Sequence, residues 1–146
     1  EQSAKQGDVI AQAVLADMYR KGSEDGPPMT IPVDPQLGFR WSLAAAQQEH
    51  VHSMLMIGFA YLKGQGVEQN DESAFEWSMK AAKKGQAYGQ WLVGLFYHNG
   101  RGGVDVNFDQ AIHWYQKSAV QGHQAAIAAV EVLEDFMNDL ALMLEM

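Results

Sequence analysis

The chain has 146 residues, 47% of them hydrophobic, which is enough for one domain with a continuous core. Its net charge is −8 and its 10 Lys and Arg residues are scattered, so the surface lacks the basic patch that binding nucleic acid requires. The absence of cysteine excludes disulfides, thiolate zinc sites and a cysteine nucleophile, and no apolar run approaches the ~20 residues of a membrane span.

The chain opens with Glu1 rather than Met, so we expect a processed or excised form. An address signal outside this sequence and the compartment, cytoplasm or periplasm, are both left open. Gly, Pro and Asn mark the breaks between segments rich in Ala, Leu, Met, Gln and Lys, which favour helix. The helices predicted in chain order are 8–21, 35–48, 50–63, 71–84, 86–99, 108–121 and 123–145. The sequence therefore predicts an all-α protein.

These helices pair into repeats, because the same landmarks return in register. Each second helix carries a Trp with a capping residue seven positions before it, and the tryptophans are 36 and 37 residues apart: Asp34 and Trp41, Asn70 and Trp77, Asn107 and Trp114. Each first helix carries a small residue, then Tyr, then Gly at intervals of three: Ala16, Tyr19 and Gly22; Gly58, Tyr61 and Gly64; Gly94, Tyr97 and Gly100. Gly85 and Gly122 are predicted to end second helices in the left-handed conformation, and Glu49 stands once in their place.

The predicted organisation is a single domain of stacked repeats. Residues 8–49, 50–85 and 86–122 form the repeats, and 123–146 form a capping helix. The first repeat is six residues longer, and the extra residues fall in Gly22–Val33. Ser3–Gly7 matches Ser118–Gly122, so residues 1–7 are predicted to be the tail of a second helix from a preceding repeat.

The landmarks resemble the Sel1-like repeat, a relative of the tetratricopeptide repeat. The third repeat matches with Val93–Tyr97, Gly100–Val104 and Ala111–Tyr115, and the second repeat matches at the same positions. The first departs, with Ala16 in place of Gly and Gly38 in place of Ala. The resemblance implies an α/α superhelix, a right-handed solenoid of helix–turn–helix repeats, acting as an adaptor in protein assemblies. Some cysteine-rich relatives act on β-lactams, but they carry paired cysteines that this chain lacks.

No residue pattern indicates catalysis, a cofactor or a metal site. His50 and His52 are two residues apart, which places them on different faces of a helix, and no HExxH pair occurs. The other histidines, His98, His113 and His123, are isolated. The glycines of Gly100–Gly103 are explained by a turn between helices, since the segment lacks the phosphate-loop pattern.

A partner, protein or peptide, is expected on the concave face that the first helices line. Positions counted from the small residue of each repeat share one helical stripe and differ among repeats, so core packing does not dictate them. The candidate partner-binding residues are Met18, His52, Met56, Tyr88, Leu92 and Phe96. Stacking is expected to join them into one surface.

Two alternatives remain. One is a hydrolase acting on cell-wall or β-lactam-type compounds, by analogy with the relatives described above. The other is an oligomerisation module formed by the apolar stripe of the last helix, Leu133, Phe136, Met137, Leu140 and Met143. The acids crowding that helix form either a solvated outer face or a docking site for a basic partner: Glu131, Glu134, Asp135, Asp139 and Glu145.

Overall fold

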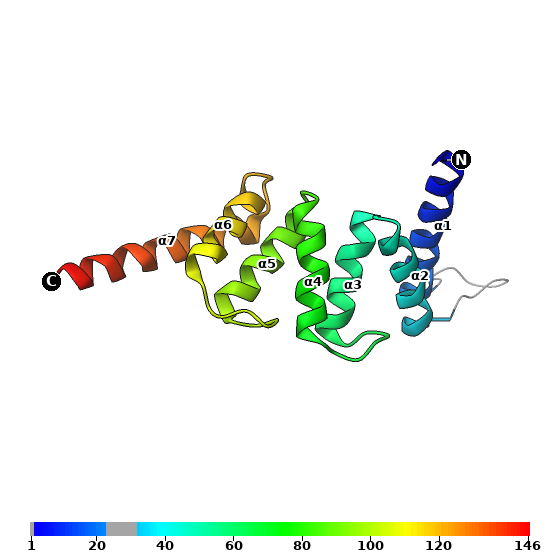
Figure 1. Ribbon diagram of the computed structural model, residues 1–146, viewed down its shortest axis with the longest axis horizontal. Coiled ribbons are helices and arrows are strands. Elements are labelled where there is room, and N and C mark those ends of the chain that lie inside the picture. The colour runs from blue at the N-terminus through cyan, green and yellow to red at the C-terminus, as the bar shows by residue number, and fades with distance from the viewer. Residues whose placement is uncertain (1, 23–31) are drawn as a thin grey trace. The chain divides into compact units, whose positions relative to one another are not determined.

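A computed structural model describes residues 2–22 and 32–146 of the chain (Figure 1). The helices within these ranges are α1 (Gln2–Lys21), α2 (Pro35–Gln47), α3 (Val51–Lys63), α4 (Asp71–Lys83), α5 (Ala87–Asn99), α6 (Phe108–Ala119) and α7 (Gln124–Glu145). No β-strand occurs in the described part of the chain. The predicted all-α class and the succession of paired helices are confirmed.

The chain divides into two compact units, Glu1–Trp77 and Ser78–Met146. In the first unit α2 packs against both α1 and α3, and in the second unit α6 packs against both α5 and α7. A second helix therefore lies between two first helices within each unit, which is how a helical repeat buries an apolar face that one hairpin leaves exposed.

The turn inside each repeat is closed by the same backbone hydrogen bond. The landmark Tyr carbonyl accepts from the amide of the residue that caps the second helix: Asp34 to Tyr19 (2.8 Å), Asn70 to Tyr61 (2.9 Å) and Asn107 to Tyr97 (2.8 Å). Each capping side chain then accepts from an amide in the first turn, as predicted: Leu37 (3.1 Å), Ser73 (3.1 Å) and Gln110 (3.0 Å). The expanded loop of the first repeat lies mostly outside the described residues, and the bond between Asp34 and Tyr19 closes it as in the other repeats.

The junctions between repeats also share one geometry. Gly85 and Gly122 have φ of 91° and 86°, which confirms their predicted left-handed conformation, and Glu49 adopts it too with φ of 66°. The next amide along the chain bonds to the carbonyl five residues before it: His50 to Ala45 (3.1 Å), Gln86 to Ala81 (3.1 Å) and His123 to Ser118 (3.4 Å). This bond reverses the direction of the chain, so the following helix runs antiparallel to the preceding one.

The predicted break at Gly7 is wrong, because α1 runs without interruption from Gln2 to Lys21. A glycine inside a helix costs only ~1 kcal/mol relative to alanine, and it ends a helix only when the chain also folds back on it. Such folded-back bonds accompany Gly85 and Gly122.

The core of the second unit is built around Tyr115 of α6, whose side chain is fully buried. Tyr115, Ala111 and Leu133 form the centre of the cluster, and half-buried side chains from α5, α6 and α7 surround it. Burial raises the pKa of Tyr115 to about 12, and its hydroxyl lies 3.1 Å from Nδ1 of His98. Gly94 faces this ring, and the absence of a side chain there lets α5 and α6 approach closely.

Candidate partner-binding surface

The first unit exposes an apolar stripe along α1. Ile10, Val14 and Met18 recur every four residues and are 59%, 53% and 38% exposed. Side chains at this spacing lie on one face of a helix, one turn apart. The stripe contains the predicted candidate Met18 and extends it by two residues from the same set of repeat positions. We call Ile10, Val14 and Met18 the α1 stripe.

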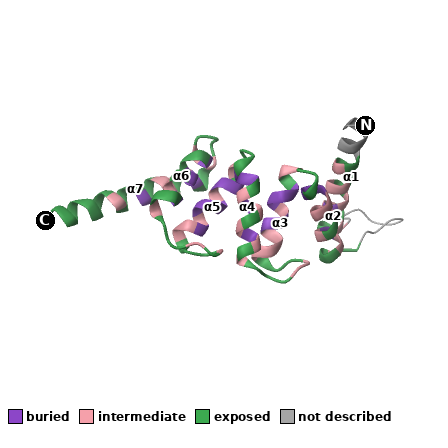
Figure 2. Cartoon of the chain, in the orientation of Figure 1, coloured by how far each residue is buried: buried purple, intermediate pink, exposed green. Residues whose placement is uncertain are grey.

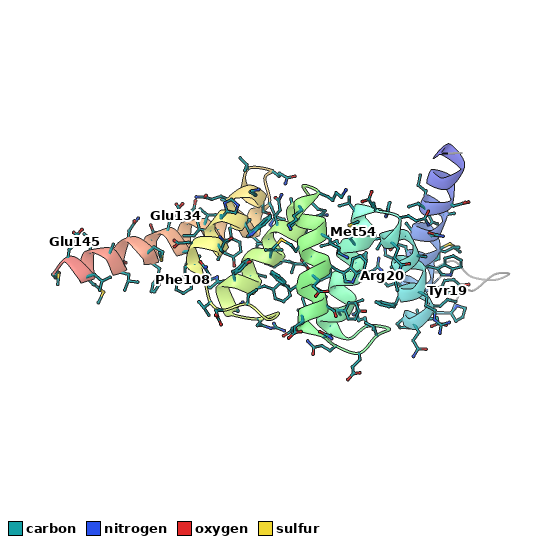
Figure 3. All side chains as sticks on the ribbon, in the orientation of Figure 1. Tyr19, Arg20, Met54, Phe108, Glu134 and Glu145 are labelled. Carbon is teal, nitrogen blue, oxygen red and sulfur yellow. The ribbon has the colours of Figure 1, made fainter. Side chains whose placement is uncertain are left out.

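Polar groups border the α1 stripe. Asp17 accepts a hydrogen bond from Nη2 of Arg20 at 2.8 Å, and Figure 3 labels Arg20 near the end of α1. Partial burial opposes ionisation of Asp17, but the hydrogen bond and charge of Arg20 outweigh it, and with Lys21 and His52 they lower the pKa of the carboxyl. His52 of α3 is exposed.

Met56 of α3 is half-buried. The first unit therefore brings three predicted candidates, Met18, His52 and Met56, onto neighbouring first helices.

The start of α3 depends on a histidine acting as a hydrogen-bond acceptor. Nδ1 of His50 accepts from the Ser53 amide at 3.3 Å and lies 2.7 Å from the Ser53 hydroxyl oxygen. The neutral ring with its proton on Nε2 can accept at Nδ1, whereas a protonated Nδ1 can only donate to the Ser53 hydroxyl and loses the bond from the Ser53 amide. Burial and the nearby charge of His52 lower the pKa of His50 below 6.5.

This cap predicts a loss of stability in mild acid. The lowered pKa of His50 in the folded chain means that its contribution is present above the unfolded pKa of 6.5 and is lost as the pH falls through the folded value. Asparagine caps helices without titrating in this range, so the His50→Asn protein is expected to lose less stability than wild type between pH 7 and 5. Urea unfolding at both pH values measures the difference, and equal losses for the two proteins would contradict the assignment.

The second unit exposes a cluster of aromatic rings where α5 and α7 begin. The Tyr88 ring meets Trp91 edge to face with centroids 5.2 Å apart, and meets His123 in the same way at 5.2 Å. Trp91 and His123 lie 5.5 Å apart. Tyr88 is 39% exposed and Trp91 is half-buried, so one side of the cluster faces solvent and the other packs against the protein. We call Tyr88, Trp91 and His123 the aromatic cluster.

The His123 ring is held in place by a backbone contact. Its Nδ1 accepts from the Ala126 amide at 3.3 Å and so caps α7, as His50 caps α3. Gln86 caps α5 at the corresponding position through the Gly89 amide at 3.0 Å. Because the ring that supports Tyr88 has this second role, the aromatic cluster is positioned by the fold.

Leu92 and Phe96 do not lie on the surface, and the expectation that they anchor a partner is wrong. They are 3% and 4% exposed. Counting from Gly94 places Leu92 and Phe96 on the stripe of α5 that corresponds to the α1 stripe. However, α5 is apolar around most of its circumference, and such a helix is buried on nearly all sides. Tyr88 remains exposed because it stands in the first turn of the helix.

Trp91 and His123 were not among the residues predicted to bind a partner. A signal for Trp91 was present, since it is the one tryptophan outside the repeating positions 41, 77 and 114. His123 is 35 residues from Tyr88 in the chain, and only the packing of α5 and α7 on α6 brings the two rings together.

Within the described ranges, no three His, Asp or Glu side chains converge as a metal-binding group. In the same residues no helix combines the length and apolar character needed to span a membrane.

The paired helices, the shared turn bonds and the shared junctions define a helical-repeat protein of the α/α superhelix class. The Sel1 repeat family matches residues 9–50, 51–86 and 87–123, so the chain belongs to the Sel1-repeat family. Sel1 repeats generally form scaffolds for protein interaction and are typically non-enzymatic.

Solved structures give the same picture. A Sel1 repeat protein from Oxalobacter formigenes is 26% identical with a TM-score of 0.79, over 89% of this chain and 51% of that one. A protective antigen of uropathogenic Escherichia coli with an SLR fold is 31% identical with a TM-score of 0.75, over 86% of this chain and 25% of that one. Cysteine-rich protein B of Helicobacter pylori shares the fold at 20% identity and a TM-score of 0.67, over 88% of this chain and 92% of that one.

The chain thus spans about half of the first of these relatives and a quarter of the second. A comparison with curated proteins gives no match.

Proposed function

We propose that this chain is an adaptor that binds a protein or peptide through the exposed side chains of its first helices. The observation that carries the proposal is the aromatic cluster, in which a part-exposed Tyr88 is held by two edge-to-face contacts. A tyrosine fixed in this way loses little conformational entropy when a partner covers it, and tyrosine and tryptophan are the residues most often found at the energetic centres of interfaces.

The α1 stripe supports the same function in the first unit. Three apolar side chains exposed in line, with Asp17 and Arg20 beside them on the same helix, form a surface with an apolar centre and a polar border. That composition is typical of protein interfaces. The proposed binding residues are therefore Met18, His52, Met56 and Tyr88, together with Ile10, Val14, Trp91 and His123.

The proposal can be tested with peptides selected from a random library displayed on phage. The affinity of a selected peptide is measured by isothermal titration with wild type and variants. Tyr88→Ala is expected to weaken binding by roughly 1–3 kcal/mol, about 5- to 150-fold, because it removes the anchor ring. Val14→Ser is expected to weaken binding of peptides that reach α1.

Matched controls separate binding from folding. Val33 and Val120 are 60% and 85% exposed and lie outside the α1 stripe and the aromatic cluster, so Val33→Ser and Val120→Ser should leave affinity unchanged. All variants should keep the wild-type melting temperature within a few degrees, since every replaced side chain is exposed. Selected peptides that bind Tyr88→Ala and Val14→Ser as tightly as wild type would refute the proposal.

A further inference from the structure

The last helix presents a second surface, separate from the α1 stripe and the aromatic cluster. α7 packs against α6 along its first half, where Ala126 and Leu133 are buried and the Phe136 ring meets Phe108 with centroids 5.7 Å apart. Nε2 of Gln116 also donates to Glu134 across this contact at 3.0 Å. Figure 2 shows the burial ending midway along α7, and its second half runs on beyond α6.

The apolar face that packs on α6 continues unchanged along the exposed half. Residues three and four apart lie on one face of a helix, and this face comprises Leu133, Phe136, Met137, Leu140, Met143 and Leu144. Leu133 is buried, whereas Phe136, Leu140, Met143 and Leu144 are 48%, 40%, 69% and 81% exposed. We call the face from Phe136 to Leu144 the α7 face.

Every charged side chain of α7 is acidic. Gln124–Glu145 contains no Lys, Arg or His, and its acids are Glu131, Glu134, Asp135, Asp139 and Glu145. They lie on the side of the helix away from the apolar face and reach its edges at Glu134 and Asp139. Figure 3 labels Glu134 beside α6 and Glu145 near the far end of the helix.

We propose that the α7 face docks an amphipathic helix of another protein, whose apolar stripe is bordered by lysines or arginines. The contact of α6 with Leu133 and Phe136 shows how a helix packs on this face, and the docked helix would extend that packing along Leu140 and Leu144. Basic residues at the borders of such a helix meet carboxylates, which sets partner choice and orientation in paired helices.

A second copy of this chain fits the α7 face less well. Each copy carries a net charge of −8, and pairing two α7 helices would bring together ten carboxylates without a single basic residue on either helix. Like charges that approach across an interface oppose association. A basic partner removes this repulsion and gains attraction from the same carboxylates.

The test uses the whole chain and two synthetic helical peptides of about four turns. Both carry leucines in a 3–4 spacing, with lysines at the borders in one peptide and glutamates in the other. Fluorescence anisotropy is expected to show saturable binding of the lysine peptide, at least about tenfold tighter than the glutamate peptide, with a difference that shrinks as salt is raised.

Two leucines of α7 provide the matched control. Leu140 lies on the α7 face and Leu142 lies about 200° around the helix from it, and they are 40% and 61% exposed. Leu140→Ser is expected to weaken binding of the lysine peptide at least about tenfold, while Leu142→Ser and Tyr88→Ala leave the affinity for this peptide unchanged. The Tyr88→Ala arm separates this proposal from the function of the first helices.

Several outcomes would overturn the proposal: no saturable binding, equal affinity for the two peptides, or equal losses in Leu140→Ser and Leu142→Ser. Sedimentation that shows a dimer of the chain which Leu140→Ser dissociates would also overturn it, and would assign the α7 face to a second copy.

Discussion

Replacement of Gly94 by leucine is expected to destabilise the protein by about 3 kcal/mol, and replacement by alanine by about 1–3 kcal/mol. A Cβ atom on Gly94 would lie 2.4 Å from Cδ1 and 2.5 Å from Cε1 of Tyr115, whose side chain is fully buried. Helix propensity predicts the opposite sign for alanine, a gain of about 1 kcal/mol inside a helix. Urea unfolding distinguishes the two, and a Gly94→Ala protein more stable than wild type would contradict the packing described here.

A double-mutant cycle assigns the loss to the Tyr115 ring. In the second repeat the residue after the landmark Trp is Ser78, so Tyr115→Ser reproduces a natural side chain at this position. Gly94→Ala is expected to be neutral or stabilising in the Tyr115→Ser background, because nothing then occupies the space of the new methyl. Gln65→Leu, at an exposed loop position, serves as the control for a larger side chain and should change stability by less than about 0.5 kcal/mol.

Gly66→Ala is the second change expected to have a large effect, a loss of about 3 kcal/mol or more. The φ of Gly66 is 74°, which costs an L-residue about 1–2 kcal/mol. A Cβ atom there would also lie 2.1 Å from the carbonyl oxygen of Pro35, in the first turn of α2. The loop between α3 and α4 would have to move away from α2, and the packing of the first two repeats would loosen.

Gly85→Ala isolates the backbone part of this effect. Gly85 has φ of 91°, and a Cβ atom there would meet nothing within 4 Å. Its loss should therefore stay within the about 1–2 kcal/mol of the left-handed conformation. Guanidinium unfolding of both variants measures how much more stability the Gly66→Ala protein loses than the Gly85→Ala protein. Equal losses of stability would show that the close approach of Pro35 to Gly66 does not contribute to the effect.

The elements and their boundaries were predictable because their signals are local. Asp34, Asn70 and Asn107 are residue types that cap helices, and Gly85 and Gly122 are typical of helix ends, so each acts through bonds within a few residues. The N-caps of α3, α5 and α7 were not predicted, because His and Gln rarely cap helices; these caps are His50, Gln86 and His123. Their position directly after each junction is the signal that identifies them.

The proposed binding surface was less predictable because it depends on how deeply each side chain is buried. Periodicity places Met18, Leu92 and Phe96 on equivalent stripes, yet Met18 is 38% exposed and the other two are buried. The difference lies in what surrounds each helix, which no repeat register encodes. The aromatic cluster could not be predicted from the sequence either, because Tyr88 and His123 come from different repeats and meet through tertiary packing.

The central claim, that a partner binds the first helices, is tested most directly by NMR of the isotope-labelled chain with a selected peptide. We predict intermolecular contacts to the Tyr88 ring or to the methyl groups of Val14 and Met18, and shift changes that decline away from the starts of α5 and α7 and from α1. Saturable binding whose contacts lie only on other surfaces, with the Tyr88 ring and the α1 stripe unchanged, would contradict it.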